Sequence, residues 1–207
     1  MIDLYSGTPG SGKSLHIASN IYWALKMGRP VLANFYIDCS QIHKRGPKKD
    51  KVLPFYEIDN QALNPEMLVN FSQNWFSRHK FHEEAILLVI DECQLLFNAR
   101  EWSKQGRSDW LSFFTQHRKY GYHVVLIAQF DRMIDRQIRS LIEYEYVHRK
   151  VSNFGIKGKA LSLVAGGRLF VAVKVWYPMN EKVGAEFFKA KKLYYNLYNS
   201  YGLFQAT

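Results

Sequence analysis

The segment Gly7-Thr8-Pro9-Gly10-Ser11-Gly12-Lys13-Ser14 constrains the fold of this chain more than any other feature. It matches the pattern GxxxxGK[ST] in full, and it lies between a short strand-like run at residues 2–5 and a helical apolar pattern from Lys13 to about Met27. The glycines let such a loop curl so that backbone N–H groups point at phosphate oxygens, and the helix N-terminus adds the positive end of its dipole. The pattern therefore predicts a strand, a phosphate-binding loop and a helix, in that order.

The loop also predicts its ligands. We expect nucleotide contacts from Gly7, Thr8, Pro9, Gly10, Ser11, Gly12, Lys13 and Ser14. Lys13 should reach the β- and γ-phosphates as a catalytic residue, and Ser14 should place its hydroxyl on Mg²⁺. The expected cofactors are ATP and Mg²⁺, with the preference for one nucleotide base left open. The alternative is a glycine-rich turn with a chance lysine, which the complete match in the right context disfavours.

A second acidic motif follows the continuous apolar run at residues 85–90, which is typical of a strand buried on both faces of a parallel sheet. A phosphate loop needs a carboxylate that holds the metal through water, and Asp91, at the end of this strand, is the expected metal-side residue. Glu92 is the expected general base for an attacking water, which favours a hydrolysing motor over a small-molecule kinase. The alternative is a solvated acidic pair, which is common at strand ends.

Two further features bear on catalysis. Gln129 closes a predicted buried strand at residues 123–128 and is expected to sense the γ-phosphate, the alternative being an amide with only local hydrogen bonds. The charge on a departing phosphate also calls for an arginine, which a neighbouring subunit can donate. The candidates are Arg100, Arg107, Arg118, Arg132, Arg136 and Arg139. For each of them alone, a solvated surface charge is the better account.

Strands alternate with helices over the first 130 or so residues, which predicts an α/β fold with a mostly parallel sheet flanked by helices. The motifs are typical of P-loop NTPases with a catalytic Glu and an added strand between the loop strand and the carboxylate strand. Other expected elements are a strand at residues 31–37, a helix opened by Asn64-Pro65 and a helix capped by Asp109. After residue 142 we expect a strand at 144–151 and an antiparallel hairpin with strands at 160–164 and 169–177. The expected division is a P-loop ATPase core at 1–142 and an antiparallel extension of the same domain at 143–207.

The charge balance predicts an acidic partner. There are 28 Lys plus Arg against 18 Asp plus Glu, a formal net charge of +10. Nucleotide phosphates, single-stranded DNA and an anionic membrane all fit this excess. The basic stretch at 44–51 and the Lys/Tyr-rich end at 187–204 are candidate contacts, although a solvated loop is the better account of the first.

The location of the chain can also be predicted from what the sequence lacks. Its two cysteines have no disulfide or zinc spacing, which suits a reducing cytosol. The first residues do not resemble a signal peptide, and no apolar run approaches the roughly 20 residues of a membrane span. We therefore expect a soluble, cytoplasmic chain.

Three segments, taken together with the distances between them along the chain, carry a resemblance to a known family. They are the loop, residues 90–94 with the sequence Ile-Asp-Glu-Cys-Gln, and residues 116–129, which begin with Gln-His-Arg-Lys and end with Ala-Gln. Over nearly its whole length the chain resembles the zonular occludens toxin family, which includes the assembly ATPases of filamentous phages. The resemblance implies a cytoplasmic nucleotide-binding domain of an inner-membrane protein, anchored by a spanning helix that this sequence does not contain. It further implies a homo-oligomer at full length that extrudes phage together with coat protein and an outer-membrane channel.

Three functions are consistent with these observations. The first is a Mg²⁺-dependent ATPase motor for filamentous phage assembly and extrusion. The second is a DNA-translocating or packaging ATPase of the same fold, and the third is a membrane scaffold that binds nucleotide without significant turnover. Glu92 distinguishes the scaffold from the two motors, because only the motors need a general base.

Overall fold

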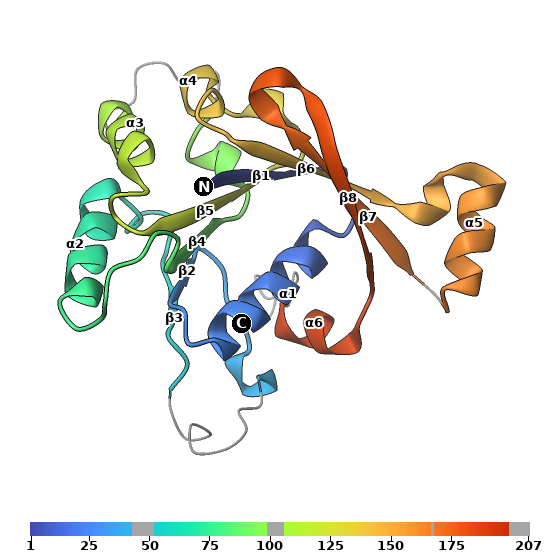
Figure 1. The fold of residues 1–207 in the computed structure, drawn as a ribbon, viewed down its shortest axis with the longest axis horizontal. Coiled ribbons are helices and arrows are strands. Elements are labelled where there is room, and N and C mark those ends of the chain that lie inside the picture. The colour runs from blue at the N-terminus through green and yellow to red at the C-terminus, as the bar shows by residue number, and fades with distance from the viewer. Residues whose placement is uncertain (43–51, 99–105, 167, 199–207) are drawn as a thin grey trace.

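The computed structural model describes residues 1–42, 52–98, 106–166 and 168–198 (Figure 1). The strands are β1 (Ile2–Ser6), β2 (Val31–Ala33), β3 (Phe55–Glu57), β4 (Ile86–Ile90), β5 (Tyr122–Ile127), β6 (Tyr144–Lys150), β7 (Leu169–Trp176) and β8 (Glu181–Lys189). The helices are α1 (Lys13–Lys26), α2 (Pro65–Phe76), α3 (Arg107–Gln116), α4 (Arg136–Arg139), α5 (Gly155–Val164) and α6 (Lys192–Leu197). Within the described residues, the strands form one sheet in the order β3-β2-β4-β5-β1-β6-β7-β8.

The sheet confirms the predicted α/β fold and its strand arrangement. The strands β1 to β6 are all parallel to one another. β7 pairs with β6 in the antiparallel direction, and β8 pairs with β7 in the same way. β5 pairs with β1 on one side and with β4 on the other, so the predicted added strand does separate the loop strand from the carboxylate strand. The carboxyl ends of these three strands therefore meet at one edge, which is where open α/β sheets bind their ligands.

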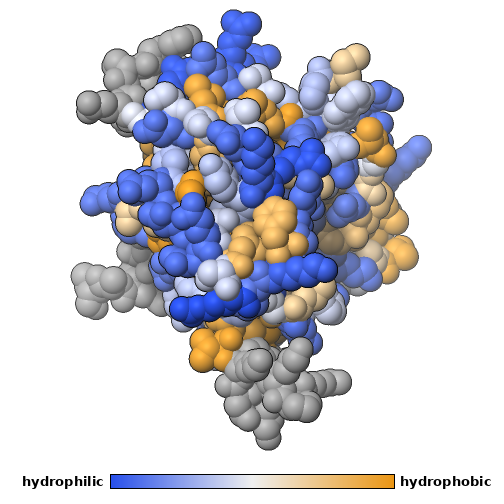
Figure 2. Space-filling model, turned by 60° about the vertical axis from the view of Figure 1, so that its left-hand side comes forward, coloured by the Kyte–Doolittle hydropathy of each residue, from blue (hydrophilic) through white to orange (hydrophobic). Residues whose placement is uncertain are grey.

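Helices cover both faces of the sheet, which explains why the central strands β2 and β4 are apolar without interruption. Leu4, Leu88 and Leu126 contribute to the core on the side of α2, α3 and α4. The next residues along the same strands, such as Tyr5 and Val89, pack on the side of α1 and α6. In Figure 1, α2 and α3 lie on the opposite side of the sheet from α1 and α6. The face shown in Figure 2 is mostly hydrophilic, with hydrophobic side chains in small separate groups.

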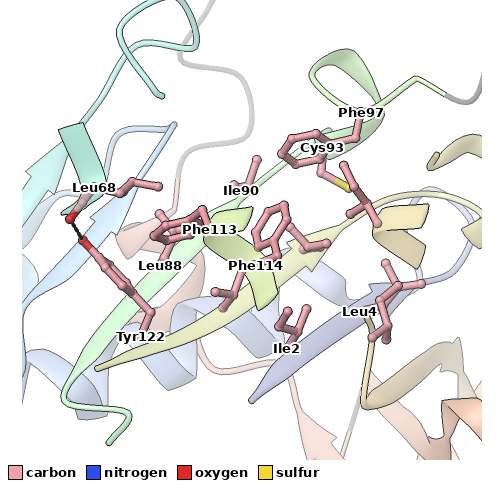
Figure 3. Close-up of a cluster of buried hydrophobic side chains, with 14 of the residues drawn as sticks. Ile2, Leu4, Leu68, Leu88, Ile90, Cys93, Phe97, Phe113, Phe114 and Tyr122 are labelled. Atoms are coloured by element: carbon pink, nitrogen blue, oxygen red, sulfur yellow. Dashed lines mark hydrogen bonds between the residues drawn. The ribbon is translucent and has the colours of Figure 1, made fainter. Parts of the chain in front are cut away.

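Figure 3 shows how the core beneath α2 and α3 holds β5 in place. Tyr122 is fully buried, and its hydroxyl donates a hydrogen bond to the carbonyl oxygen of Leu68 in α2 at 2.7 Å. The rings of Phe113 and Phe114 pack edge to face on each other, with centroids 5.6 Å apart. A buried hydroxyl needs such a partner, so this bond fixes α2 over the strand that ends at the candidate site.

Two helix starts can be compared with their predictions. Asn64 caps α2 as predicted, because its side-chain oxygen accepts from the backbone N–H of Met67 at 2.9 Å and proline occupies the first helical position. The predicted cap of α3 at Asp109 is wrong. That helix begins at Arg107 after Gly106, whose φ of 96° is left-handed, and Asp109 lies in the first turn. Asp109 still stabilises the helix there, because a negative charge offsets the positive end of the dipole.

The C-terminal part of the chain contains an antiparallel hairpin before α6, as predicted, but the predicted strands were partly misplaced. The hairpin consists of β7 and β8, and residues 160–164 belong to α5 instead. A short apolar run does not distinguish a strand from a helix. Gly158 lets α5 approach the chain before it, since a Cβ there would lie 2.1 Å from the carbonyl oxygen of Val151. The hairpin turn uses Asn180, at a φ of 53°.

Other predictions concern strand length and segments outside the described residues. The strand predicted at 31–37 ends at Ala33, for a reason that the candidate site makes clear. The basic stretch at 44–51 lies outside the described residues, as does most of the loop expected between residues 98 and 107. None of the helices described has the length and apolar character needed to cross a bilayer. The division of the chain near residue 142 stays a prediction.

Candidate functional site

The predicted site residues lie around two adjoining cavities at the carboxyl edge of the parallel strands. The larger cavity, of about 690 Å³, is lined by Pro9, Gly10, Ser11, Gly12, Lys13, Ser14, Leu15, Asp91, Glu92, Gln129, Lys150, Arg168, Phe170, Tyr195 and Tyr198. The smaller one, of about 430 Å³, adds Gly7 and Thr8 and shares Gln129. Segments more than 100 residues apart in sequence are thus brought together.

The loop conformation depends on glycine at both of its ends. Gly7 has a φ of 137°, and a Cβ there would lie 2.6 Å from the backbone oxygen of His148. Gly12 has a φ of 100°, and its Cβ would lie 2.7 Å from the ring of Phe170. Both positions exclude an L side chain, by backbone angle and by space. The spacing in the sequence therefore reflects a real geometric requirement.

The interior of the loop fits a phosphate group. The backbone N–H of Gly7 donates to the carbonyl oxygen of Gln129 at 3.1 Å, which ties the start of the loop to the end of β5. Lys13 folds back so that its ammonium donates to the carbonyl oxygens of Gly7 and Thr8. Burial lowers the pKa of Lys13, while the nearby carboxylates raise it. Among the described residues, the buried Ser11 hydroxyl oxygen has no hydrogen-bond partner. A bound phosphate would offer oxygen atoms to which the Lys13 ammonium and the Ser11 hydroxyl can donate hydrogen bonds.

A pair of histidines supports the loop from below. His16 in α1 and His148 in β6 form a ring-nitrogen hydrogen bond of 2.9 Å. The Nδ1 of His148 also faces the carbonyl oxygens of Tyr146 at 2.8 Å and Ser6 at 3.2 Å, so it must carry the proton and donate. Burial, and secondarily His16, lower the pKa of His148 to about 3, so its ring is neutral near pH 7. The pair joins α1 to β6 and to the last residue of β1.

The position of Asp91 is set by a side chain that sequence analysis did not single out. The Asn34 amide oxygen accepts from the backbone N–H of Asp91 at 2.7 Å, and its nitrogen donates to the Asp91 carbonyl oxygen at 2.8 Å. The same nitrogen donates to Asn60 at 2.8 Å. Asn34 thus extends the β2–β4 pairing with its side chain, which explains why the backbone strand stops at Ala33. Asn34 is a positioning residue.

Replacing Asn34 with alanine is expected to lower the free energy of unfolding by about 1–3 kcal/mol, because two backbone groups of Asp91 lose their partners. Urea unfolding followed by circular dichroism measures this difference. Asn74→Ala, on the exposed side of α2, is the matched control and should change stability by less than about 0.5 kcal/mol. Equal effects of the two substitutions would contradict the assigned role.

Asp91 and Glu92 have different surroundings although they are neighbours. The backbone N–H of Glu92 donates to Asp91 Oδ1 at 2.8 Å, and the Tyr198 hydroxyl donates to Asp91 Oδ2 at 2.5 Å. Burial raises the pKa of Asp91, and these hydrogen bonds lower it. Glu92 has a left-handed φ of 48°, is exposed, and accepts a hydrogen bond from Gln94. Non-glycine residues rarely adopt this conformation, and the strain at Glu92 must be maintained by its surroundings.

The oxygen ligands of this site fit a magnesium ion. Ser14 offers a hydroxyl and Asp91 a carboxylate, both hard donors of the kind that Mg²⁺ prefers. Within the described ranges, no group of three or more His, Cys, Asp or Glu residues could hold a metal. The site therefore suits an ion that takes its remaining ligands from phosphate and water, as Mg²⁺ usually does.

Four polar or charged residues that line the cavity were not predicted as site residues: Lys150, Arg168, Tyr195 and Tyr198. Lys150 ends β6, Arg168 precedes β7, and the tyrosines belong to the Lys/Tyr-rich end that was a candidate contact for an acidic partner. They add two cations and two aromatic rings to the loop cavity.

The arginines proposed from sequence lie elsewhere. Arg107 pairs with Asp135 at 2.6 Å, Arg118 with Glu83 at 3.0 Å, and Arg139 approaches Asp131 at 3.9 Å. None of these three lines either cavity, nor do Arg132 and Arg136, and Arg100 lies outside the described residues. An arginine finger from any of the five described residues would therefore have to be donated by another subunit.

Comparison with known proteins gives the family. The sequence model of the family described as "Zonular occludens toxin (Zot)" matches residues 1–204. The chain belongs to the zonular occludens toxin family. The "Gene 1 protein" of Enterobacteria phage I2-2 is 28% identical to this Zot-family chain over 167 residues, which are 79% of the chain and 45% of the relative. The "Putative assembly protein ORF301" of Pseudomonas phage Pf3 is 29% identical over 144 residues, 69% of the chain and 40% of the relative. The Zot-family chain thus spans about half the length of the curated relatives it matches, or less.

Solved structures confirm the predicted P-loop NTPase fold. The N-terminal domain of zonular occludens toxin from Neisseria meningitidis has a TM-score of 0.54 at 17% identity, covering 96% of this Zot-family chain and 98% of that one. The genome packaging NTPase B204 from Sulfolobus turreted icosahedral virus 2, in complex with ATP-gammaS, has a TM-score of 0.53 at 15% identity, covering 92% and 97%. At these identities the likeness concerns the fold alone.

Proposed function

We propose that this domain binds Mg²⁺–ATP in the larger cavity, hydrolyses it and drives filamentous phage assembly and extrusion. The observation that carries the proposal is that one cavity joins the phosphate loop to Asp91, Glu92 and Gln129. The motif residues of β1, β4 and β5 were predicted separately along the chain, and the fold brings them to one place. The similarity to a putative phage assembly protein supports the biological part of the proposal.

In this proposal each residue has a defined task. Lys13 leaves the loop carbonyl oxygens and binds the β- and γ-phosphates, while Ser14 and Asp91 hold Mg²⁺. The bound ion would neutralise charge on the transferred phosphoryl group. Glu92 accepts a proton from the attacking water at its exposed carboxylate, and Gln129, fixed to the loop through Gly7, senses the γ-phosphate.

A DNA-translocating or packaging ATPase is the second candidate. The formal charge of +10 favours single-stranded DNA as a partner, and the fold is shared with a genome packaging NTPase. The first candidate adds coat protein and an outer-membrane channel as partners, and it locates this domain on the cytoplasmic side of the inner membrane. In both, the domain works as a homo-oligomer of the full-length protein. The third candidate, a scaffold without turnover, needs no general base.

Steady-state ATP hydrolysis at several protein concentrations, with and without single-stranded DNA, tests the proposal. Because mass action fills sites shared between subunits, specific activity is expected to rise with concentration. Stimulation by single-stranded DNA would favour the second candidate over the first. Nucleotide binding with no turnover at any concentration would contradict both motors and favour the scaffold.

A mixing experiment then identifies the donated arginine. The Lys13→Ala protein is expected not to hydrolyse ATP, but it keeps all of its arginines and can donate one to a neighbouring subunit. It is mixed in turn with Ala variants of Arg100, Arg118, Arg132, Arg136 and Arg139. Rescue of one arginine variant is expected, since the missing side chain is restored in trans. Flat specific activity with no rescue would contradict shared active sites.

A further inference from the structure

Tyr198 lies where the metal ligands of the proposed site converge. Its hydroxyl donates to Asp91 Oδ2 at 2.5 Å. Ser14, at the start of α1, and Asp91, directly after β4, line the same cavity as Tyr198. A side chain that follows α6 therefore already binds an oxygen atom of the carboxylate that the metal would need.

The segment before Tyr198 is firmly packed, so the contact does not depend on one flexible side chain. Leu197 in α6 is fully buried and Tyr194 is 7% exposed, and both pack beside α1. The backbone N–H of Asp38 donates to the Leu197 carbonyl oxygen at 3.0 Å. The ring of Tyr198 meets Phe35 edge-on with centroids 4.7 Å apart. These contacts deliver the hydroxyl to Asp91.

The Tyr198 hydroxyl and a bound ion with its waters compete for the carboxylate of Asp91. Mg²⁺ requires a nearly ideal octahedron of oxygen ligands at about 2.0–2.1 Å, and it keeps several of its waters. A phenol hydroxyl 2.5 Å from Asp91 Oδ2 occupies space and a lone pair that this shell, with its waters, would use. Binding of the metal–nucleotide complex is therefore opposed by the hydrogen bond between Tyr198 and Asp91.

We propose that Tyr198 closes the metal site in the nucleotide-free protein and is displaced when Mg²⁺–nucleotide binds, so that α6 responds to the nucleotide state. This inference rests on the proposed function and adds a means of regulation to the same site. Since α6 contacts α1 directly behind the loop, the displacement moves or loosens the segment that follows β8. The apparent affinity for Mg²⁺–nucleotide equals the intrinsic affinity multiplied by the fraction of protein in the open state.

The test compares Tyr198→Phe with the wild-type protein by titration of a fluorescent ATP analogue, with Mg²⁺ and with EDTA. Phenylalanine keeps the ring against Phe35 and removes only the hydroxyl. With Mg²⁺, Tyr198→Phe is expected to bind roughly tenfold more tightly, the factor that corresponds to about 1.4 kcal/mol. With EDTA the two proteins should bind alike, because no ion then competes with Tyr198 for Asp91. Tyr56→Phe, in β3 at the far edge of the sheet, is the matched control and should behave as wild type.

Hydrogen exchange provides a readout that does not depend on the substitution. In the wild-type protein, amide exchange in residues 192–198 is expected to become faster when Mg²⁺–nucleotide is added and to stay unchanged with nucleotide in EDTA. Unchanged or weaker Mg²⁺–nucleotide binding by Tyr198→Phe, or exchange in α6 that ignores Mg²⁺–nucleotide, would overturn the inference while leaving nucleotide binding intact. Failure of every protein to bind the analogue would instead overturn the proposed function, and the inference with it.

Discussion

Lys13→Ala is expected to weaken nucleotide binding by roughly 10- to 100-fold, since a hydrogen bond to a charged group contributes about 1.5–3 kcal/mol. The backbone of the loop supplies partial charges only, and Lys13 is the loop's one full positive charge. Its ammonium is held by the carbonyl oxygens of Gly7 and Thr8, so it is already beside the place where the phosphates are expected. Alanine removes the charge without filling the cavity.

The measurement for Lys13 is equilibrium binding of a fluorescent ATP analogue in the presence of Mg²⁺. Lys182→Ala, on the exposed strand β8, is the control for a general loss of positive charge and should leave binding unchanged. Circular dichroism checks that both variants fold. If Lys13→Ala bound nucleotide as tightly as Lys182→Ala, the loop would have no part in nucleotide recognition.

Glu92→Gln is expected to lower kcat by roughly 10²- to 10⁴-fold and to leave Mg²⁺–ATP binding nearly unchanged. The reason is the separation of tasks between two neighbouring carboxylates. Asp91 is half-buried and hydrogen bonded by Tyr198, and in the proposed function it holds the metal. Glu92 is exposed, and the proposal does not require it to hold the ion. Glutamine keeps the shape of Glu92 but cannot accept the proton of an attacking water.

Steady-state turnover and nucleotide affinity should both be measured for Glu92→Gln, because only their divergence identifies a general base. Glu181→Gln, at the exposed start of β8, controls for the loss of one negative charge. Turnover by Glu92→Gln at the rate of Glu181→Gln would mean that Glu92 is a solvated carboxylate. An equal loss of binding and turnover would place Glu92 in binding instead of proton transfer.

The elements with local signals were predicted well from the sequence. The loop between β1 and α1 depends on glycines at fixed spacing, and Gly7 and Gly12 do occupy positions that admit no side chain. The strands β4 and β5 are apolar on both faces and could be assigned to the interior of a parallel sheet. Because the carboxyl ends of parallel strands lie at one edge, placing Asp91 and Gln129 near the loop required no knowledge of side-chain contacts.

What the sequence did not reveal depends on contacts between distant segments. Asn34 looked like part of a longer strand, yet its amide pairs with the backbone of Asp91, 57 positions away. Residues 160–164 have the composition of either a strand or a helix, and only the close approach that Gly158 allows indicates why the helix forms there. The arginines were chosen for their closeness in sequence to the motifs, whereas the cavity cations outside the loop, Lys150 and Arg168, come from the C-terminal part of the chain. Tyr198 lies in the Lys/Tyr-rich end that was a candidate contact for an acidic partner, but nothing in the sequence placed it beside Asp91, because its position depends on the docking of α6.

Release of inorganic phosphate from ATP tests the central claim, Mg²⁺-dependent hydrolysis in the cavity of the loop, most directly. Wild-type protein, Lys13→Ala and Glu92→Gln are purified in parallel and assayed with Mg²⁺ and with EDTA, at concentrations high enough for subunits to associate. We expect release by the wild-type protein in Mg²⁺ only, and at most a trace from either variant. Phosphate release that persists in EDTA or in Lys13→Ala, or its absence from wild-type protein that has bound Mg²⁺–ATP, would contradict the claim.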